Sequence, residues 1–133
     1  MTRFYSIDDA NAAMAEVEPI LVGLRDERKE LIRLRDRALA GRASGTTDGE
    51  TKEAERLLRL RMQGLIDQMQ AGVMRLDELG VTLREIETGL IDFAALVNGR
   101  QVWLCWRLGE GPIEWWHELD TGFASRQRLI DLV

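Results

Sequence analysis

The stretch "VNGRQVWLCWRLGEGPIEWWHEL", Val97 to Leu119, decides the fold of the second half of the chain. It contains all four tryptophans, the only histidine and the only cysteine of the 133 residues. Asn98-Gly99 lies between two apolar runs and favours a type I′ hairpin turn, because both central residues of that turn have positive φ. A second turn is predicted at "GEGP", Gly109 to Pro112. The stretch therefore predicts consecutive antiparallel strands.

The second turn also predicts which side chains share a face of the sheet. Leu108 opposite Ile113 places Arg107 opposite Glu114, an opposite-charge pair that stabilises neighbouring strands. In this register one face forms the core, with His117 as its one polar residue, and Cys105 points to the opposite face. The core face carries Val102, Leu104, Trp106, Leu108, Ile113, Trp115, His117 and Leu119. The mixed face carries Trp103, Cys105, Arg107, Glu114, Trp116 and Glu118.

Two amphipathic helices are predicted before these strands. Ser6 followed by Asp9 indicates an N-cap, so the first helix begins directly after Ser6. Pro19 removes a backbone donor and predicts a kink or a break. The segment 40–50 has the glycines and small polar residues of a loop, and Gly80 is a natural C-cap for the second helix. Apolar residues repeat every three or four positions, namely Val17, Ile20, Leu24, Leu31, Leu34 and Ala38, then Leu58, Met62, Leu65, Met69, Leu76 and Leu79.

These patterns predict an α+β fold in one domain, residues 1–133. Residues 7–80 form a long antiparallel helical hairpin of coiled-coil type. Residues 81–133 form a small antiparallel β-meander of three to four strands, closed by an irregular tail from Asp120. The alternating "VTLREIE", residues 81–87, is the first strand. Whether the hairpin closes within one chain or is swapped between chains stays open.

The composition limits the kind of protein and its partners. Hydrophobic residues make up 45% and charged residues 31%, which is typical of a soluble globular chain. No apolar run approaches the roughly 18 residues that span a bilayer, and "MTRFYSIDDA" lacks the apolar core of a signal peptide. A lone cysteine agrees with a reducing compartment. We therefore expect a cytoplasmic protein that contacts no membrane.

A nucleic-acid partner is also disfavoured. The net charge is −5, and the arginines of Leu24 to Arg37 alternate with acidic residues. Binding to a phosphate backbone favours an unbroken basic surface.

His117 is the first candidate for chemistry, because histidine titrates near neutral pH and binds metals. It is either a core histidine with both ring nitrogens hydrogen-bonded, or an acid–base group or metal ligand. Cys105 lies mid-strand, where a buried unreactive thiol is the usual outcome. The candidate polar pocket consists of Asp92, Glu110, His117, Asp120 and Arg126. Within it, His117, Glu110 and Asp120 are the candidate ligands of a divalent metal, and no cofactor is expected otherwise.

The tryptophans and the tail arginines suggest binding surfaces. Trp103 and Trp116 on the mixed face form a wall for a ligand or, preferably, a protein interface. Arg126 and Arg128 are candidates to bind an anion, whereas a charge pair with Asp120 or Glu118 is the simpler explanation.

The stretch Thr88 to Leu129 resembles the signature of a prokaryotic family, domain-of-unknown-function family 2203. That signature runs G-L-x-D-F-P, then D-G-R-x-V-x-L-C-W-x-L-G-E, then W-H-x-L-x-x-G-F-x-x-R-x-P-L, and "FYSIDDANAAM" near the N-terminus is similar to the family's start. Ala94 and Arg128 stand where the family has proline, which affects the loop geometry. The resemblance implies no activity. The positions carried over, without roles, are Asp92, Trp106, Glu110, Trp116, His117, Gly122 and Arg126.

Two functions remain after these observations. Helices longer than the sheet can cover leave apolar seams exposed, and exposed seams associate. The first expectation is therefore a homodimer or higher oligomer that acts as a structural or protein-interaction module. The alternative is a small-molecule or metal-dependent enzyme that uses the polar pocket, with His117 as base or ligand.

Overall fold

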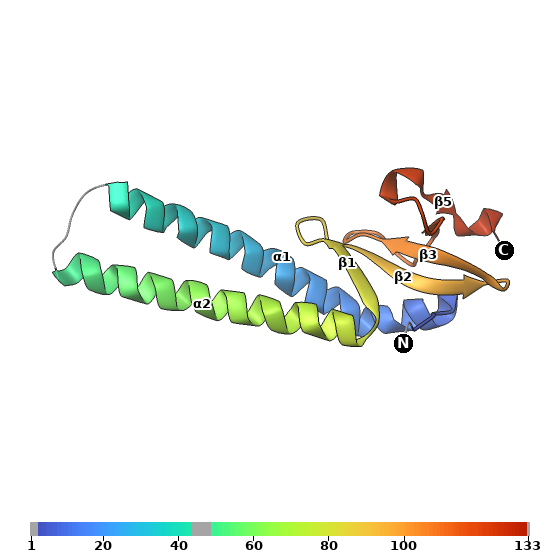
Figure 1. Ribbon diagram of the computed structural model, residues 1–133, viewed down its shortest axis with the longest axis horizontal. Helices are drawn as coiled ribbons and strands as arrows, with labels where there is room; N and C mark the ends of the chain where they lie inside the picture. Colours follow the sequence, from blue (N-terminus) through green and yellow to red (C-terminus); the bar gives the residue numbers. More distant parts are fainter. Residues whose placement is uncertain (1–2, 44–48, 133) are drawn as a thin grey trace.

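The structure is a computed structural model that describes residues 3–43 and 49–132. Its two helices form a hairpin that projects from a small sheet (Figure 1). The predicted α+β fold is confirmed. The helices and strands are α1 (Ile7–Ala43), α2 (Gly49–Glu78), β1 (Val81–Glu85), β2 (Leu90–Val97), β3 (Arg100–Trp106), β4 (Trp115–His117) and β5 (Gln127–Arg128), with 3₁₀ turns η1 (Phe123–Ser125) and η2 (Leu129–Asp131).

The ends of the hairpin form where the sequence predicts them. The backbone N–H of Asp9 donates to Ser6 Oγ at 3.0 Å, which is the predicted N-cap. Gly80 ends α2 with a φ of 75°, the left-handed conformation that a C-cap glycine adopts. The ion pair between Arg61 and Glu30, at 2.9 Å, joins the two helices within the chain.

Two details of the hairpin differ from the prediction. Of the two predicted outcomes at Pro19, a kink or a break, the break does not occur, because α1 is one uninterrupted helix with Pro19 inside it. Proline removes only one helical hydrogen bond, and the apolar packing on both sides keeps the helix continuous. The predicted loop 40–50 is also too long, because α1 extends to Ala43 and α2 begins at Gly49. The rest of that predicted loop, 44–48, lies outside the described residues.

In the described part of the chain, five antiparallel strands form one sheet in the order β1-β2-β3-β4-β5. Asn98 and Gly99 join β2 to β3 with φ values of 54° and 76°, which confirms the predicted type I′ turn. The count exceeds the predicted three to four strands because the tail, predicted to be irregular, contributes β5. Arg128 of β5 pairs with Trp115 of β4.

The sheet has two differently covered faces. The inner face packs on the sheet-proximal ends of α1 and α2, and it holds the apolar core. After β4, residues 119–123 cross the outer face beside Asp92 and Cys105. The tail then returns to the start of α1, where Leu129 and Ile7 line one cavity. The inner-face core residues include Ile91, Phe93, Ala95, Val102, Leu104, Trp106 and Trp116.

The predicted register between β3 and β4 is wrong by one residue. Trp103 pairs with His117, and Cys105 pairs with Trp115. Residues 107–114 form a longer connection than a tight turn, in which the Arg107 N–H donates to the Glu110 carboxylate at 2.8 Å. A slip of one residue exchanges the two faces of a strand. His117 therefore lies on the outer face together with Cys105, and not opposite to it as predicted.

Candidate functional site

Three buried polar side chains from adjacent strands meet on the outer face of the sheet. Asp92 of β2 pairs directly with Cys105 of β3, and His117 comes from β4. Their exposed fractions are 2%, 1% and 1%. One potential ligand atom from each residue lies within 4.8 Å of the others. We call these three residues the outer-face cluster.

Both ring nitrogens of His117 have partners inside the protein. Nδ1 lies 2.9 Å from the carbonyl oxygen of Glu118, and Nε2 lies 3.0 Å from Oδ2 of Asp92. Both partners are acceptors, so either the ring carries two N–H protons beside an ionised carboxylate, or Asp92 carries the proton that Nε2 accepts. This geometry agrees with the core-histidine interpretation, because neither nitrogen faces open space.

Asp92 has one well-bonded oxygen and one oxygen whose nearest polar neighbour on the paired strand is the thiol of Cys105. Oδ2 accepts from Arg84 Nε at 2.8 Å as well as facing the histidine. Oδ1 is buried and has no hydrogen-bond partner among the described residues. Leaving a buried acceptor unpaired costs about 1–3 kcal/mol, so this oxygen calls for an explanation.

Cys105 is a protonated thiol at neutral pH. Burial raises the pKa of the thiol to about 12, and the negative charge of Asp92 acts in the same direction. The guanidinium of Arg126 opposes the rise. Because the thiolate is the nucleophile, Cys105 by itself is unreactive.

Glu110 and Arg126 form a second, separate group. Arg126 Nη1 lies 2.9 Å and 3.1 Å from the two carboxylate oxygens of Glu110. The guanidinium also lies over the rings of Trp115, at 4.7 Å, and Phe123, at 4.1 Å. This pair fastens the tail onto the outer face. The predicted charge pair with Asp120 or Glu118 is therefore wrong in its partner, because Arg126 pairs with Glu110 and Glu118 pairs with Arg100.

A cavity of about 360 Å³ opens beside the outer-face cluster. Asp92 and Cys105 form part of its wall, and Asp120 lies across the same cavity in the tail. The structure thus brings Asp92, His117 and Asp120 to one region. Glu110 and Arg126 do not line this cavity. The positive charge of Arg126 nevertheless acts on the Cys105 thiol, whose pKa it lowers. The cavity lining includes Arg84, Asp92, Cys105, Asp120, Thr121 and Phe123.

A family model described as "Uncharacterized conserved protein (DUF2203)" matches residues 3–129. The chain belongs to the DUF2203 family. The match spans both the hairpin and the sheet, so the resemblance seen in the sequence is confirmed. No curated protein and no solved structure matches the chain. Among the residues described for this DUF2203 chain, no helix has the length and apolar character needed to cross a membrane.

The observed register of β3 and β4 places one of the two candidate tryptophans of this DUF2203 protein on the other face of the sheet from the one predicted. Trp116 pairs with Leu104, lies on the inner face and is buried. Its predicted place on an exposed mixed face is therefore wrong. Trp103 lies on the outer face, half-buried, and its Nε1 donates to the carbonyl of Leu119 at 3.3 Å. The two rings do not form a shared wall.

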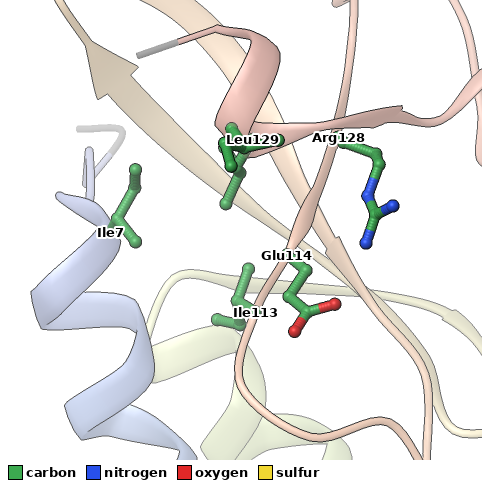
Figure 2. A pocket seen from close by; sticks show the side chains of 6 residues that line it. Ile7, Ile113, Glu114, Arg128 and Leu129 are labelled. Carbon is green, nitrogen blue, oxygen red and sulfur yellow. The ribbon is translucent and has the colours of Figure 1, made fainter.

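A larger cavity of about 480 Å³ lies at the start of α1, and of the candidate residues of this DUF2203 chain only Arg128 lines it. Figure 2 shows Ile7, Ile113 and Leu129 on the side of α1, with Glu114 and Arg128 on the other side. Its lining is mostly apolar, and Glu114 and Arg128 are its charged members.

Sequence reasoning missed Arg84 and assigned Cys105 to the wrong partners. Arg84 alternates with Thr82 in "VTLREIE", so strand alternation places both on one face. Thr82 pairs with Asp92 in the sheet, and this pairing brings Arg84 to that carboxylate. Strand alternation in residues 81–87, combined with the pairing of that strand to β2, is therefore enough to predict that Arg84 lies near Asp92.

Proposed function

We propose that the protein is a cytoplasmic homodimer that acts as a structural or interaction module, with the hairpin as the association surface. The observation that carries this proposal is the sparse packing of α2. Leu76 is the one buried residue among the described side chains of this 30-residue helix. Most helix stability in proteins comes from packing of an apolar face. We therefore expect a partner to pack against the apolar side chains of α2 that α1 and the sheet leave exposed.

The hairpin offers apolar side chains to a partner. Leu31 of α1 and Ile66, Met69 and Val73 of α2 line a shallow apolar hollow of about 460 Å³. Met74 borders the same hollow and is 63% exposed. Toward the tip, Leu39, Leu57 and Leu60 are each more than half exposed. Exposed apolar side chains gathered around a hollow are typical of an interaction site.

The charges of the hairpin favour a second copy of the chain in antiparallel orientation. The sheet-proximal part, residues 7–24 and 64–80, contains seven acidic residues and one basic residue. The distal part, residues 32–43 and 49–63, contains eight basic and four acidic residues, and residues 25–31 between the two parts contain three of each. A twofold antiparallel arrangement places the basic part of each hairpin against the acidic part of the other. The four helices then form a coiled-coil bundle.

Sedimentation equilibrium tests this proposal. We expect a mass of about 30 kDa, twice the 15.2 kDa of the chain. The change Met74→Glu places a charge in the hollow and shifts the population toward the monomer. Ile130→Glu, at an apolar residue outside the hairpin that is even more exposed, leaves the mass unchanged. A monomer at micromolar concentration in the unmodified protein would refute the dimer.

High salt adds a test of the orientation. Charge complementarity between exposed residues weakens as ionic strength rises. An antiparallel dimer therefore dissociates more readily in molar salt, whereas a parallel one, with like charges adjacent, becomes tighter. Tighter association at high salt would overturn the antiparallel arrangement.

We keep a ligand-binding or enzymatic role for the outer-face cavity as the second candidate. One observation favours it, namely that the unpaired Oδ1 of Asp92 belongs to a residue that lines the cavity. An enzyme that uses His117 as a free base is not supported, because both ring nitrogens have hydrogen-bond partners inside the protein. A screen of small ligands by thermal denaturation, with Asp120→Asn as the cavity variant, tests for binding there. Ligands that stabilise neither protein remove this candidate in its small-molecule form.

A further inference from the structure

We propose that Asp92, Cys105 and His117 bind one divalent transition-metal ion, with Zn²⁺ as the best match, at the inner end of the outer-face cavity. This proposal specifies the ligand of the second candidate function and is independent of the dimer. The three residues supply one oxygen, one sulfur and one nitrogen ligand atom, all within 4.8 Å of one another. Bonds of about 2.0–2.3 Å to zinc place tetrahedral ligands roughly 3–4 Å apart, so small side-chain movements close the site.

The unpartnered Oδ1 of Asp92 is the independent observation that points to a ligand. It is buried, it lacks a hydrogen-bond partner among the described residues, and its side chain lines the cavity. A bound cation gives this oxygen the partner that the protein does not supply. Meanwhile Arg84 continues to hold Oδ2 and fixes the orientation of the carboxylate.

The surroundings of His117 match those of a metal-bound histidine. Nδ1 lies 2.9 Å from the carbonyl of Glu118, so Nδ1 carries a proton and donates it to that oxygen. Metal-bound histidines use the same arrangement, in which the second nitrogen donates to a carbonyl or a carboxylate and fixes the tautomer. Nε2 is then directed toward Asp92, where the metal would bind.

Metal binding balances the charges of the buried cluster. In the metal-free cluster, one proton lies on the Cys105 sulfur and one is shared between Asp92 and His117. A divalent cation replaces both protons, forms bonds to the thiolate sulfur, the carboxylate oxygen and Nε2, and releases two protons to solvent. One thiolate and one carboxylate then neutralise the two positive charges, and a fourth position faces the cavity for water.

The donor set selects the class of metal. A thiolate and an imidazole favour zinc, cobalt or iron over magnesium and calcium, which prefer oxygen ligands. The other charged groups around the cluster are Arg84, which is paired with Asp92, Arg126, which is paired with Glu110, and Asp120 in the cavity wall. Asp120 partly offsets the two arginines on the path by which a cation reaches the site.

Cobalt(II) titration tests the site, because the chain contains one cysteine and one histidine. The protein is purified without a histidine tag, treated with chelator and reductant, and titrated with Co²⁺. We expect a thiolate-to-cobalt charge-transfer band that saturates at one cobalt per chain and disappears when Zn²⁺ is added. No binding, or binding without that band, overturns the proposal. Either result leaves the dimer unaffected, because the solution mass is measured on metal-free protein.

Two variants and a matched control test the Cys105 and Asp92 ligands. Cys105→Ser removes the charge-transfer band, and Asp92→Asn weakens cobalt binding by at least about tenfold. Asp120→Asn, in the same cavity but outside the donor set, retains the band and the affinity. Far-ultraviolet circular dichroism of each variant verifies that it folds. A folded Cys105→Ser protein that binds Co²⁺ as tightly as the unmodified protein, or an Asp120→Asn protein that loses binding while Asp92→Asn keeps it, overturns the proposed ligand set.

Discussion

Oδ2 of Asp92 lies 3.0 Å from Nε2 of His117, and both residues are almost completely buried under the tail. A hydrogen bond between a carboxylate and an imidazole requires a proton on one of them. The same carboxylate oxygen also accepts from Arg84. Asp92 therefore connects β1, β2 and β4 on the outer face of the sheet. Removing its side chain leaves Arg84 and His117 without their partner at the same time.

The first prediction concerns the stability that Asp92 provides. Asp92→Ala leaves His117 without a partner for Nε2 and Arg84 without its carboxylate. Breaking a buried ion pair by removing one member costs about 3–5 kcal/mol, so we expect a loss of this order in the free energy of unfolding. Urea denaturation of metal-free protein measures it. Asp120→Ala, an exposed carboxylate across the cavity, changes stability by less than about 0.5 kcal/mol. Equal losses in both variants would contradict the central role of Asp92.

The second prediction concerns alkaline pH. The pKa of Cys105 is raised from an ordinary value near 9 to about 12. Between these values the unfolded chain releases the thiol proton while the folded chain keeps it, so stability falls as pH rises through this window. The expected slope is about 1.4 kcal/mol per pH unit above pH 9.

Comparison with Cys105→Ser isolates this contribution, because other groups titrate equally in both proteins. The stability difference between the two proteins is constant below pH 8 and shifts against the unmodified protein above pH 9. A difference that stays constant up to pH 11 would mean that the thiol ionises normally in the folded state.

Local sequence rules predicted much of the fold but little of the site. The N-cap at Ser6, the C-cap at Gly80 and the Asn98-Gly99 turn were predicted correctly, because each depends on a few neighbouring residues. The register between β3 and β4 was not, because the Trp106 indole bonds to the carbonyl of Gly111 and lengthens the connection. No local rule for "GEGP" includes that bond.

The single slipped register explains most of what the sequence missed at the site. It moves His117 to the face of Cys105 and Asp92, and it moves Trp116 into the core. The sequence alone offers two alternatives for His117, a hydrogen-bonded core residue or a functional group. The partners that decide between them, Glu118 and Asp92, depend on that register.

The third prediction concerns the attachment of the tail. Arg126→Met removes both contacts to Glu110 and the charge over the rings of Trp115 and Phe123. Hydrogen bonds to charged groups contribute about 1.5–3 kcal/mol, so the tail is expected to open more often. Limited proteolysis should cut near residues 118–126 faster than in the unmodified protein. The control is Arg128→Met, an exposed arginine over the same Trp115 ring at 5.6 Å, which leaves the cutting rate nearly unchanged.

The last prediction concerns Gly89, which lies between β1 and β2. Its φ is 65°, and an added Cβ would lie 2.4 Å from Cγ of Leu108. Gly89→Ala therefore combines the cost of a left-handed backbone, about 1–2 kcal/mol, with displacement of a side chain that packs against the core. Gly99→Ala is the matched control, because its φ of 76° is similar but open space surrounds its Cβ position. Thermal unfolding should show the larger loss for Gly89→Ala. If the two losses are equal, Leu108 yields without cost and only the backbone conformation requires glycine at residue 89.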